Sequence, residues 1–108
     1  MESEESNQSI KKIFNEYQIE LTSNMDYINI LIQNRNTFNI YESKFNLEYL
    51  HQFKLLIGNF TIDEMIAFLN DLFEKKDIKI EENENNLKLI LISHHTYPNV
   101  KLILKKRI

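Results

Sequence analysis

The hydrophobic period of the chain changes twice, and this change restricts the fold more than any other feature. Before Asn46 apolar residues alternate with polar ones, as at Ile28, Ile30 and Ile32, which is the period of a half-buried strand. From Asn46 the apolar spacing becomes three and four residues, typical of amphipathic helices. Alternation returns near Ile78. The sequence therefore predicts strands, then helices, then strands.

The first half of the chain predicts three strands separated by turns rich in serine, asparagine and aspartate. Because the turns are short, the strands form an antiparallel meander. In the third strand we expect Phe38 and Ile40 to face inward, and Asn39 and Tyr41 to face outward. The three expected strands span residues 16–22, 27–33 and 37–43.

The N-terminal segment leaves two interpretations open. Residues 1–8 are polar and acidic, so we expect a disordered tail ahead of a single domain over residues 9–108. Ser9 could cap a short helix, because apolar residues follow it at helical spacing. Tyr17 and Ile19, however, belong to an alternating pattern that favours a strand. Whether residues 9–17 are helix or strand stays open.

The first expected helix begins after Asn46, whose side chain is a good N-cap. Apolar residues at helical spacing continue from Leu47 to Ile57. Gly58 follows directly and is the only glycine in the chain. We expect this glycine to end the helix in the left-handed conformation that helix C-termini favour.

The second expected helix carries a capping box at its start. Thr61 and Glu64 each satisfy one of the other's free backbone donors, and Lys75 and Lys76 close the helix at the negative end of its dipole. One face is apolar and is expected to face the core. This face consists of Ile62, Met65, Ile66, Leu69, Leu72 and Phe73.

The last third predicts a tight hairpin and a final strand. The hairpin turn is the polar segment 83–86, residues 94–99 form a loop, and the last strand covers 100–105. The fold class is thus α+β, an antiparallel meander or sandwich interrupted by a helix-turn-helix pair (βββ-αα-βββ). The hairpin register that pairs opposite charges on one face and apolar groups on the other sets Glu81 opposite Lys88, Ile80 opposite Leu89 and Ile78 opposite Leu91.

Composition excludes several kinds of site. The chain has no cysteine, so it has neither disulfides nor thiolate metal ligands. Its single glycine argues against a phosphate-binding loop, and the adjacent His94 and His95 point to opposite sides of an extended chain. No cofactor and no metal are expected. Apolar runs of about four residues are far too short to span a bilayer, and the acidic N-terminus is unlike a signal peptide.

An apolar streak on the last strands is the candidate interaction surface. Ile90 and Ile92 occupy positions that alternate with core-facing residues, and Ile103 does the same in the final strand. Lys101 and Lys105 lie at the rim of this streak. An exposed apolar patch of this kind marks a binding surface for a protein partner or a second copy. The alternative is that residues 10–40 fold over the streak and form a sandwich.

Three segments of the chain carry a resemblance to known domains. Residues 45–53, 61–69 and 78–92 look like a domain that recurs in protists with A/T-rich genomes. The element order also resembles the head domains of the centriolar cartwheel protein and of the end-joining scaffold that partners DNA ligase. That resemblance implies a scaffold or adaptor module. The cartwheel head docks through an apolar hairpin tip, whereas the hairpin tip expected here is polar, so no functional residue carries over.

These observations favour a non-enzymatic protein–protein interaction or scaffold domain within a larger intracellular assembly, cytoplasmic or cytoskeletal. The mild net charge of −3 gives no general attraction to nucleic acid or anionic membranes. A nucleic-acid-binding subunit that uses the lysine-rich strands is the alternative. A third hypothesis, a small enzyme at the loop 94–97, requires a pocket beside that loop.

Overall fold

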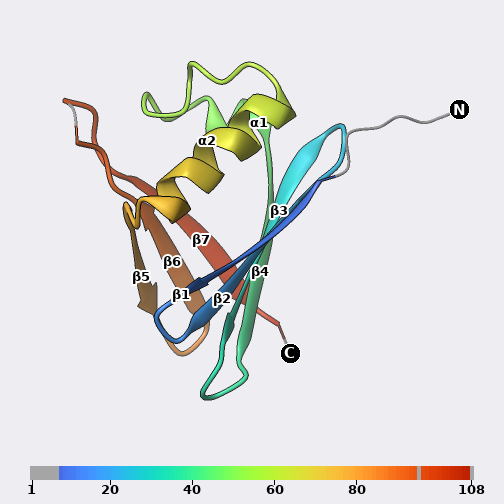
Figure 1. Cartoon of the computed structure of the whole chain (residues 1–108), viewed down its shortest axis with the longest axis vertical. Helices are drawn as coiled ribbons and strands as arrows, with labels where there is room; N and C mark the ends of the chain where they lie inside the picture. Colours follow the sequence, from blue (N-terminus) through green and yellow to red (C-terminus); the bar gives the residue numbers. More distant parts are fainter. Residues whose placement is uncertain (1–7, 95, 108) are drawn as a thin grey trace, which may run out of the picture.

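The chain folds into one curled antiparallel sheet of seven strands with two helices (Figure 1). The structure is a computed structural model that describes residues 8–94 and 96–107. The strands follow the spatial order β1-β2-β3-β4-β7-β6-β5. Their bounds are β1 Ser9–Phe14, β2 Tyr17–Ser23, β3 Tyr27–Asn34, β4 Ile40–Asn46, β5 Ile78–Glu82, β6 Asn86–Leu91 and β7 Val100–Lys106.

The segment 9–17, for which the sequence allowed either a helix or a strand, begins with a strand. β1 pairs with β2 from Ser9 opposite Thr22 to Phe14 opposite Tyr17. The two-residue turn between them places Asn15 at φ 55°, a left-handed conformation that asparagine tolerates better than most residues. Four strands therefore precede the helices, and the expected order of three strands, two helices and three strands is not confirmed.

The N-terminal hairpin already pairs at Gln8. The backbone N–H of Gln8 donates to Ser23 Oγ at 3.3 Å, and the N–H of Ser23 donates to the Gln8 carbonyl at 3.1 Å. The rest of the expected tail, residues 1–7, lies outside the described residues.

Strand β4 presents the opposite face from the one expected. Phe38 is 71% exposed and Tyr41 only 1%, so the prediction that Phe38 and Ile40 face inward is wrong. The turn between β3 and β4 is longer than expected, because the Asn34 side chain accepts the N–H of Asn36 at 2.8 Å and organises a loop. Phe38 ends this loop at φ 65°. The alternation therefore starts one residue later than the sequence pattern indicated.

Helix α1 spans only Leu47–Leu50, so the helix predicted to continue to Ile57 is wrong. Asn46 does cap it, because its side-chain oxygen accepts the Tyr49 N–H at 2.7 Å. The chain then runs through successive turns to Gly58. Gly58 has no positive φ, so it is not the predicted left-handed cap. These turns bury Leu56 completely and leave Ile57 54% exposed, which a straight helix on the same apolar face would not do.

Helix α2, Ile62–Glu74, agrees with the prediction at both ends and along its buried face. The Glu64 N–H donates to Thr61 Oγ1 at 3.1 Å, and the Thr61 N–H donates to Glu64 Oε1 at 3.3 Å. At the C-terminus Lys76 takes φ 60°, and the Asp77 N–H donates back to the Leu72 carbonyl. Within the described residues no helix has the length and apolarity to cross a membrane.

The C-terminal hairpin has the predicted register. The pairs of β5 with β6 include Ile78 with Leu91, Ile80 with Leu89 and Glu81 with Lys88.

The curled sheet forms two arms that enclose the core. Figure 1 shows β1–β4 on one side and β5–β7 on the other, with α2 across the wide end between them. Alternate residues of both arms point inward, for example Ile30 in β3, Leu89 in β6 and Leu102 in β7, and they pack with Met65 and Leu69 of α2. The sheet itself thus supplies both apolar layers.

A carboxylate joins the two arms from inside. Glu82, at the end of β5, accepts the Tyr17 hydroxyl at 2.9 Å, the Asn34 amide at 2.9 Å and the Tyr41 hydroxyl at 2.7 Å. Burial by itself raises the pKa of Glu82, but these hydrogen bonds outweigh it and hold the pKa below its usual 4.5. Burial, followed by the hydrogen bond to Glu82, raises the pKa of Tyr41 to about 12.

Replacing this carboxylate by an amide tests its role. Glu82→Gln should lower the free energy of unfolding by about 1–3 kcal/mol at neutral pH, because buried donors lose a charged acceptor. The stability that Glu82 contributes is present above pH 4.5 and is lost as the pH falls through its lowered folded-state pKa. Urea unfolding of the wild type and of Glu82→Gln should therefore show a difference in the free energy of unfolding that becomes smaller at acid pH. Glu84→Gln, at the exposed hairpin turn, is the control and should change little. If the two proteins differ in free energy of unfolding by the same amount at neutral and at acid pH, a role for the charge is contradicted.

Candidate interaction surface

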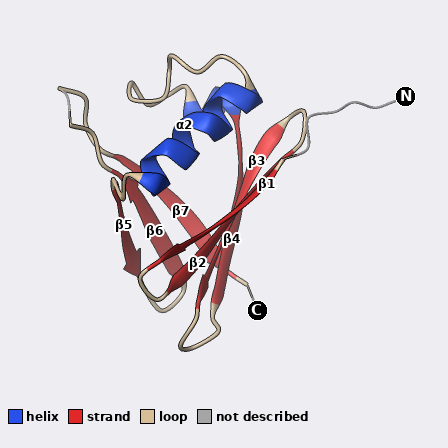
Figure 2. Ribbon diagram, viewed as in Figure 1, coloured by secondary structure: helices blue, strands red, loops and turns tan. Residues whose placement is uncertain are grey.

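The junction between the two arms is short. The ladder between β4 and β7 contains two residue pairs, whereas β3 pairs with β4 along seven. Figure 2 shows β4 and β7 together near the C-terminal end of β7 and apart toward the helices. The ladder ends where the Lys105 N–H donates to the Ser43 hydroxyl at 3.3 Å. The two pairs are Tyr41 with Lys106 and Glu42 with Lys105.

The diverging strands direct backbone groups into the space between them. The N–H of Arg107 donates to the Ile40 carbonyl, and the N–H of Lys106 donates to Asn85 on the other side. Since backbone groups alternate along an antiparallel strand, those of Lys101 and Ile103 point toward β4. The pairing of β4 with β7 does not reach them.

An aromatic column lies beside this gap. The rings of Phe45 and Tyr49 stack with centroids 5.7 Å apart, and Tyr49 meets Phe53 edge-on at 5.6 Å. The apolar spacing that predicted a helix from Leu47 to Ile57 includes Phe53, but it gives Tyr49 no role. The spacing of four between aromatic residues was the signal that could have revealed the column.

A groove of about 520 Å³ occupies the space between the diverging strands. Residues 42–46 of β4 form one wall, and Ile103 and Lys105 of β7 form the other, with Tyr49 beside them. The groove therefore combines an aromatic and aliphatic lining with strand edges, and two of the predicted surface residues lie in it.

The predicted isoleucine streak is divided by the fold. Ile103 is 41% exposed on the outer face of β7, but Ile90 is only 6% exposed. Ile90 lies between Lys79 and Lys101 in the ladder, where the aliphatic stems of long cationic side chains shield apolar neighbours. Lys79 and Lys101 are themselves exposed, so no layer of the described residues covers this face.

Ile92 belongs to a different surface. It follows β6, its N–H donates to the Asp77 carbonyl at 3.0 Å, and its side chain lines a second cleft beside α2. The interaction role of the predicted residues stays a prediction, but only Ile103, Lys101 and Lys105 share one accessible region.

The lysines of the outer face differ in their partners. Lys79 lies 3.6 Å from Glu81, and Glu81 is also the cross-strand neighbour of Lys88. Lys101 and Lys105 form no ion pair with a carboxylate of the described residues. Glu42 lies opposite Lys105 in the ladder, so the positive charge of this face is least compensated at Lys101.

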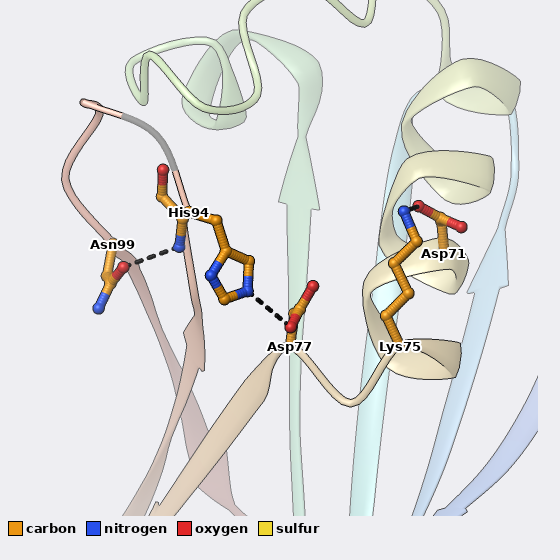
Figure 3. A network of polar contacts seen from close by, with 6 residues as sticks. Asp71, Lys75, Asp77, His94 and Asn99 are labelled. Atoms are coloured by element: carbon orange, nitrogen blue, oxygen red, sulfur yellow. Dashed lines mark hydrogen bonds and ion pairs between the residues drawn. The ribbon is translucent and has the colours of Figure 1, made fainter.

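The second cleft, of about 320 Å³, lies beside the loop 94–97 and has a mainly apolar lining that includes Leu55, Phe68 and Tyr97. Figure 3 shows the polar network at its rim. His94 Nε2 lies 2.8 Å from Asp77 Oδ1, and Lys75 Nζ lies 3.0 Å from Asp71 Oδ2. The polar groups thus pair with one another around an apolar floor.

This cleft supplies the concavity that the small-enzyme hypothesis requires. At its rim the His94 ring is directed at Asp77. Within the described residues no group of three or more histidine, aspartate or glutamate side chains is placed to hold a metal ion.

No family model matches the chain, and no curated protein matches it in sequence. In structure it is similar to the head domain of human CCDC61, with a TM-score of 0.64 and 12% sequence identity. The match covers 94% of this chain and 97% of that domain. At this identity the likeness shows the fold alone.

The aromatic column should stabilise the side of the groove. Tyr49→Ala removes two ring contacts, each worth about 0.5–1.5 kcal/mol, so the free energy of unfolding should fall by about 1–3 kcal/mol. Tyr49→Phe keeps both rings in contact and should stay close to wild type in thermal and urea unfolding. Equal losses in the two variants would mean that the hydroxyl, rather than the ring stack, holds the column.

Proposed function

We propose that this chain is a non-enzymatic protein–protein interaction or scaffold domain that acts within a larger intracellular assembly, in the cytoplasm or on the cytoskeleton. One observation carries the proposal. Ile103 lies exposed at the edge of a groove, and it is flanked by Lys101 and Lys105, which have no carboxylate partner among the described residues. An apolar contact with a charged rim is the usual composition of a protein interface.

The fold supports the same proposal. The likeness to the head domain of human CCDC61 and the resemblance of the element order to the cartwheel and end-joining heads both suit an assembly module. The hairpin turn 83–86 is polar here, which argues against docking through that tip. The β4–β7 groove is the better candidate for the contact.

The lysine face also permits the alternative of nucleic-acid binding, because the ladder places Lys79, Lys88, Lys101 and Lys105 on one side of the sheet. Phosphate binding of this kind depends strongly on salt. A titration with generic DNA and RNA at low salt should show no measurable affinity, and a steep salt-dependent affinity would favour the alternative.

A charge-reversed surface tests the proposal. Lys101→Glu with Ile103→Asp changes two exposed side chains of β7, so the protein should remain folded and lose its partners. Co-purification from the native cells, quantified by mass spectrometry, should show a loss of at least about tenfold for proteins bound through this face. Ile90 is left unchanged because it is buried.

The chain contains a matched control for this experiment. Lys11 and Ile13 have the same spacing and are both exposed, on the edge strand β1. Lys11→Glu with Ile13→Asp should keep the partners. Partners retained by both double variants, or lost equally from both, would contradict an interface at Ile103.

A further inference from the structure

The groove leaves a strand edge open inside the sheet. β7 pairs fully with β6, but its pairing with β4 stops at Lys105, so the N–H and C=O groups of Lys101 and Ile103 face the gap. Free edges of this kind accept an additional strand from another chain. Because the groove is lined by β4 on its far side, an added strand would have side-chain contacts on both sides.

The side chains around this edge define what the added strand must carry. A residue paired opposite Ile103 lies on the same outer face as Ile103 and is best apolar. Its neighbour two positions along lies opposite Lys101 and is best acidic. At the other end of the groove Lys105 already lies opposite Glu42 in the β4–β7 ladder, so the added strand ends beside Ile103.

We infer that the β4–β7 groove binds an extended acidic peptide of a partner protein as an added strand on β7. The favoured pattern is an apolar residue opposite Ile103, followed two positions later by a glutamate or aspartate opposite Lys101. The inference rests on the proposed function and names the partner's chemistry and the way in which it binds.

Charge favours an acidic peptide in the groove over a second copy of the chain or a nucleic acid. A second copy that offered its edge strand β1 would bring Lys11 and Lys12 against Lys101 and Lys105, and like charges directly opposite are destabilising. Nucleic acid would meet the lysines but has no peptide groups to continue the ladder. An acidic strand satisfies both the charge and the open backbone groups.

A synthetic peptide of about eight residues tests the inference. It has a central valine, a glutamate two positions after it and threonines at the other positions. Titrated into the isotopically labelled protein, it should shift the NMR amide signals of residues 43–46 and 100–105 and bind more weakly at higher salt. Shifts confined to β1 or β5, which are the two outer edges of the sheet, would overturn the inference.

Two altered peptides separate strand addition from simple charge attraction. Methylation of the valine nitrogen removes the hydrogen bond to the Ile103 carbonyl and should weaken binding about fivefold to tenfold. Exchange of the glutamate for lysine should abolish binding. If the N-methylated peptide binds as well as the parent, no strand is added and the inference fails.

The protein variants complete the test. Lys101→Glu with Ile103→Asp should weaken peptide binding at least about tenfold, whereas Lys11→Glu with Ile13→Asp should leave it unchanged. Equal binding to both variants would overturn the site, and binding of short DNA or RNA in place of the peptide would overturn the partner class. If co-purification depends on Ile103 but the peptide does not bind, the proposed function stands and only this mode of binding is wrong.

Discussion

The Glu82 carboxylate is the contact on which the shape of the molecule depends. It reaches from β5 across the interior to hydroxyl and amide groups of β2, β3 and β4, so one side chain of the short arm contacts three strands of the long arm. Along the sheet the arms are joined by only two residue pairs. The carboxylate therefore supplies a connection that the ladder does not, and its charged acceptor strengthens each of the three hydrogen bonds.

These two connections, the Glu82 hydrogen bonds and the short β4–β7 ladder, also explain the groove. Because the arms are held together from inside at one end, β4 and β7 are free to diverge at the other, where helix α2 packs into the core. The divergence exposes the edge of β7 next to Ile103, Lys101 and Lys105, and neither lysine forms an ion pair with a carboxylate of the described residues. The candidate interface is thus a consequence of how the sheet closes.

Local signals predicted the elements that depend on local contacts. Helix α2 carries its own capping box, and the β5–β6 hairpin sets its register through adjacent charge and apolar pairs. The errors lie where distant residues decide. Tyr41 turns inward because its hydroxyl meets Glu82, forty-one positions away, and the chain after α1 turns to bury Leu56 instead of continuing as a helix.

The candidate surface shows the same limit. Alternation placed Ile90 and Ile103 on the outer face correctly, but it could not show that Lys79 and Lys101 flank Ile90 from neighbouring strands. The groove itself was beyond prediction, because it depends on where the β4–β7 ladder stops. No property of either strand's own sequence marks that point.

The position of β7 has a consequence for how the protein is made. It is the last of the seven strands along the chain, yet it lies between β4 and β6 in the sheet. During synthesis the N-terminal meander and the β5–β6 hairpin emerge first. The two units cannot pair within one sheet until β7 has been made. Both growing units keep an unpaired edge until then, which is the condition under which nascent β proteins recruit chaperones or aggregate.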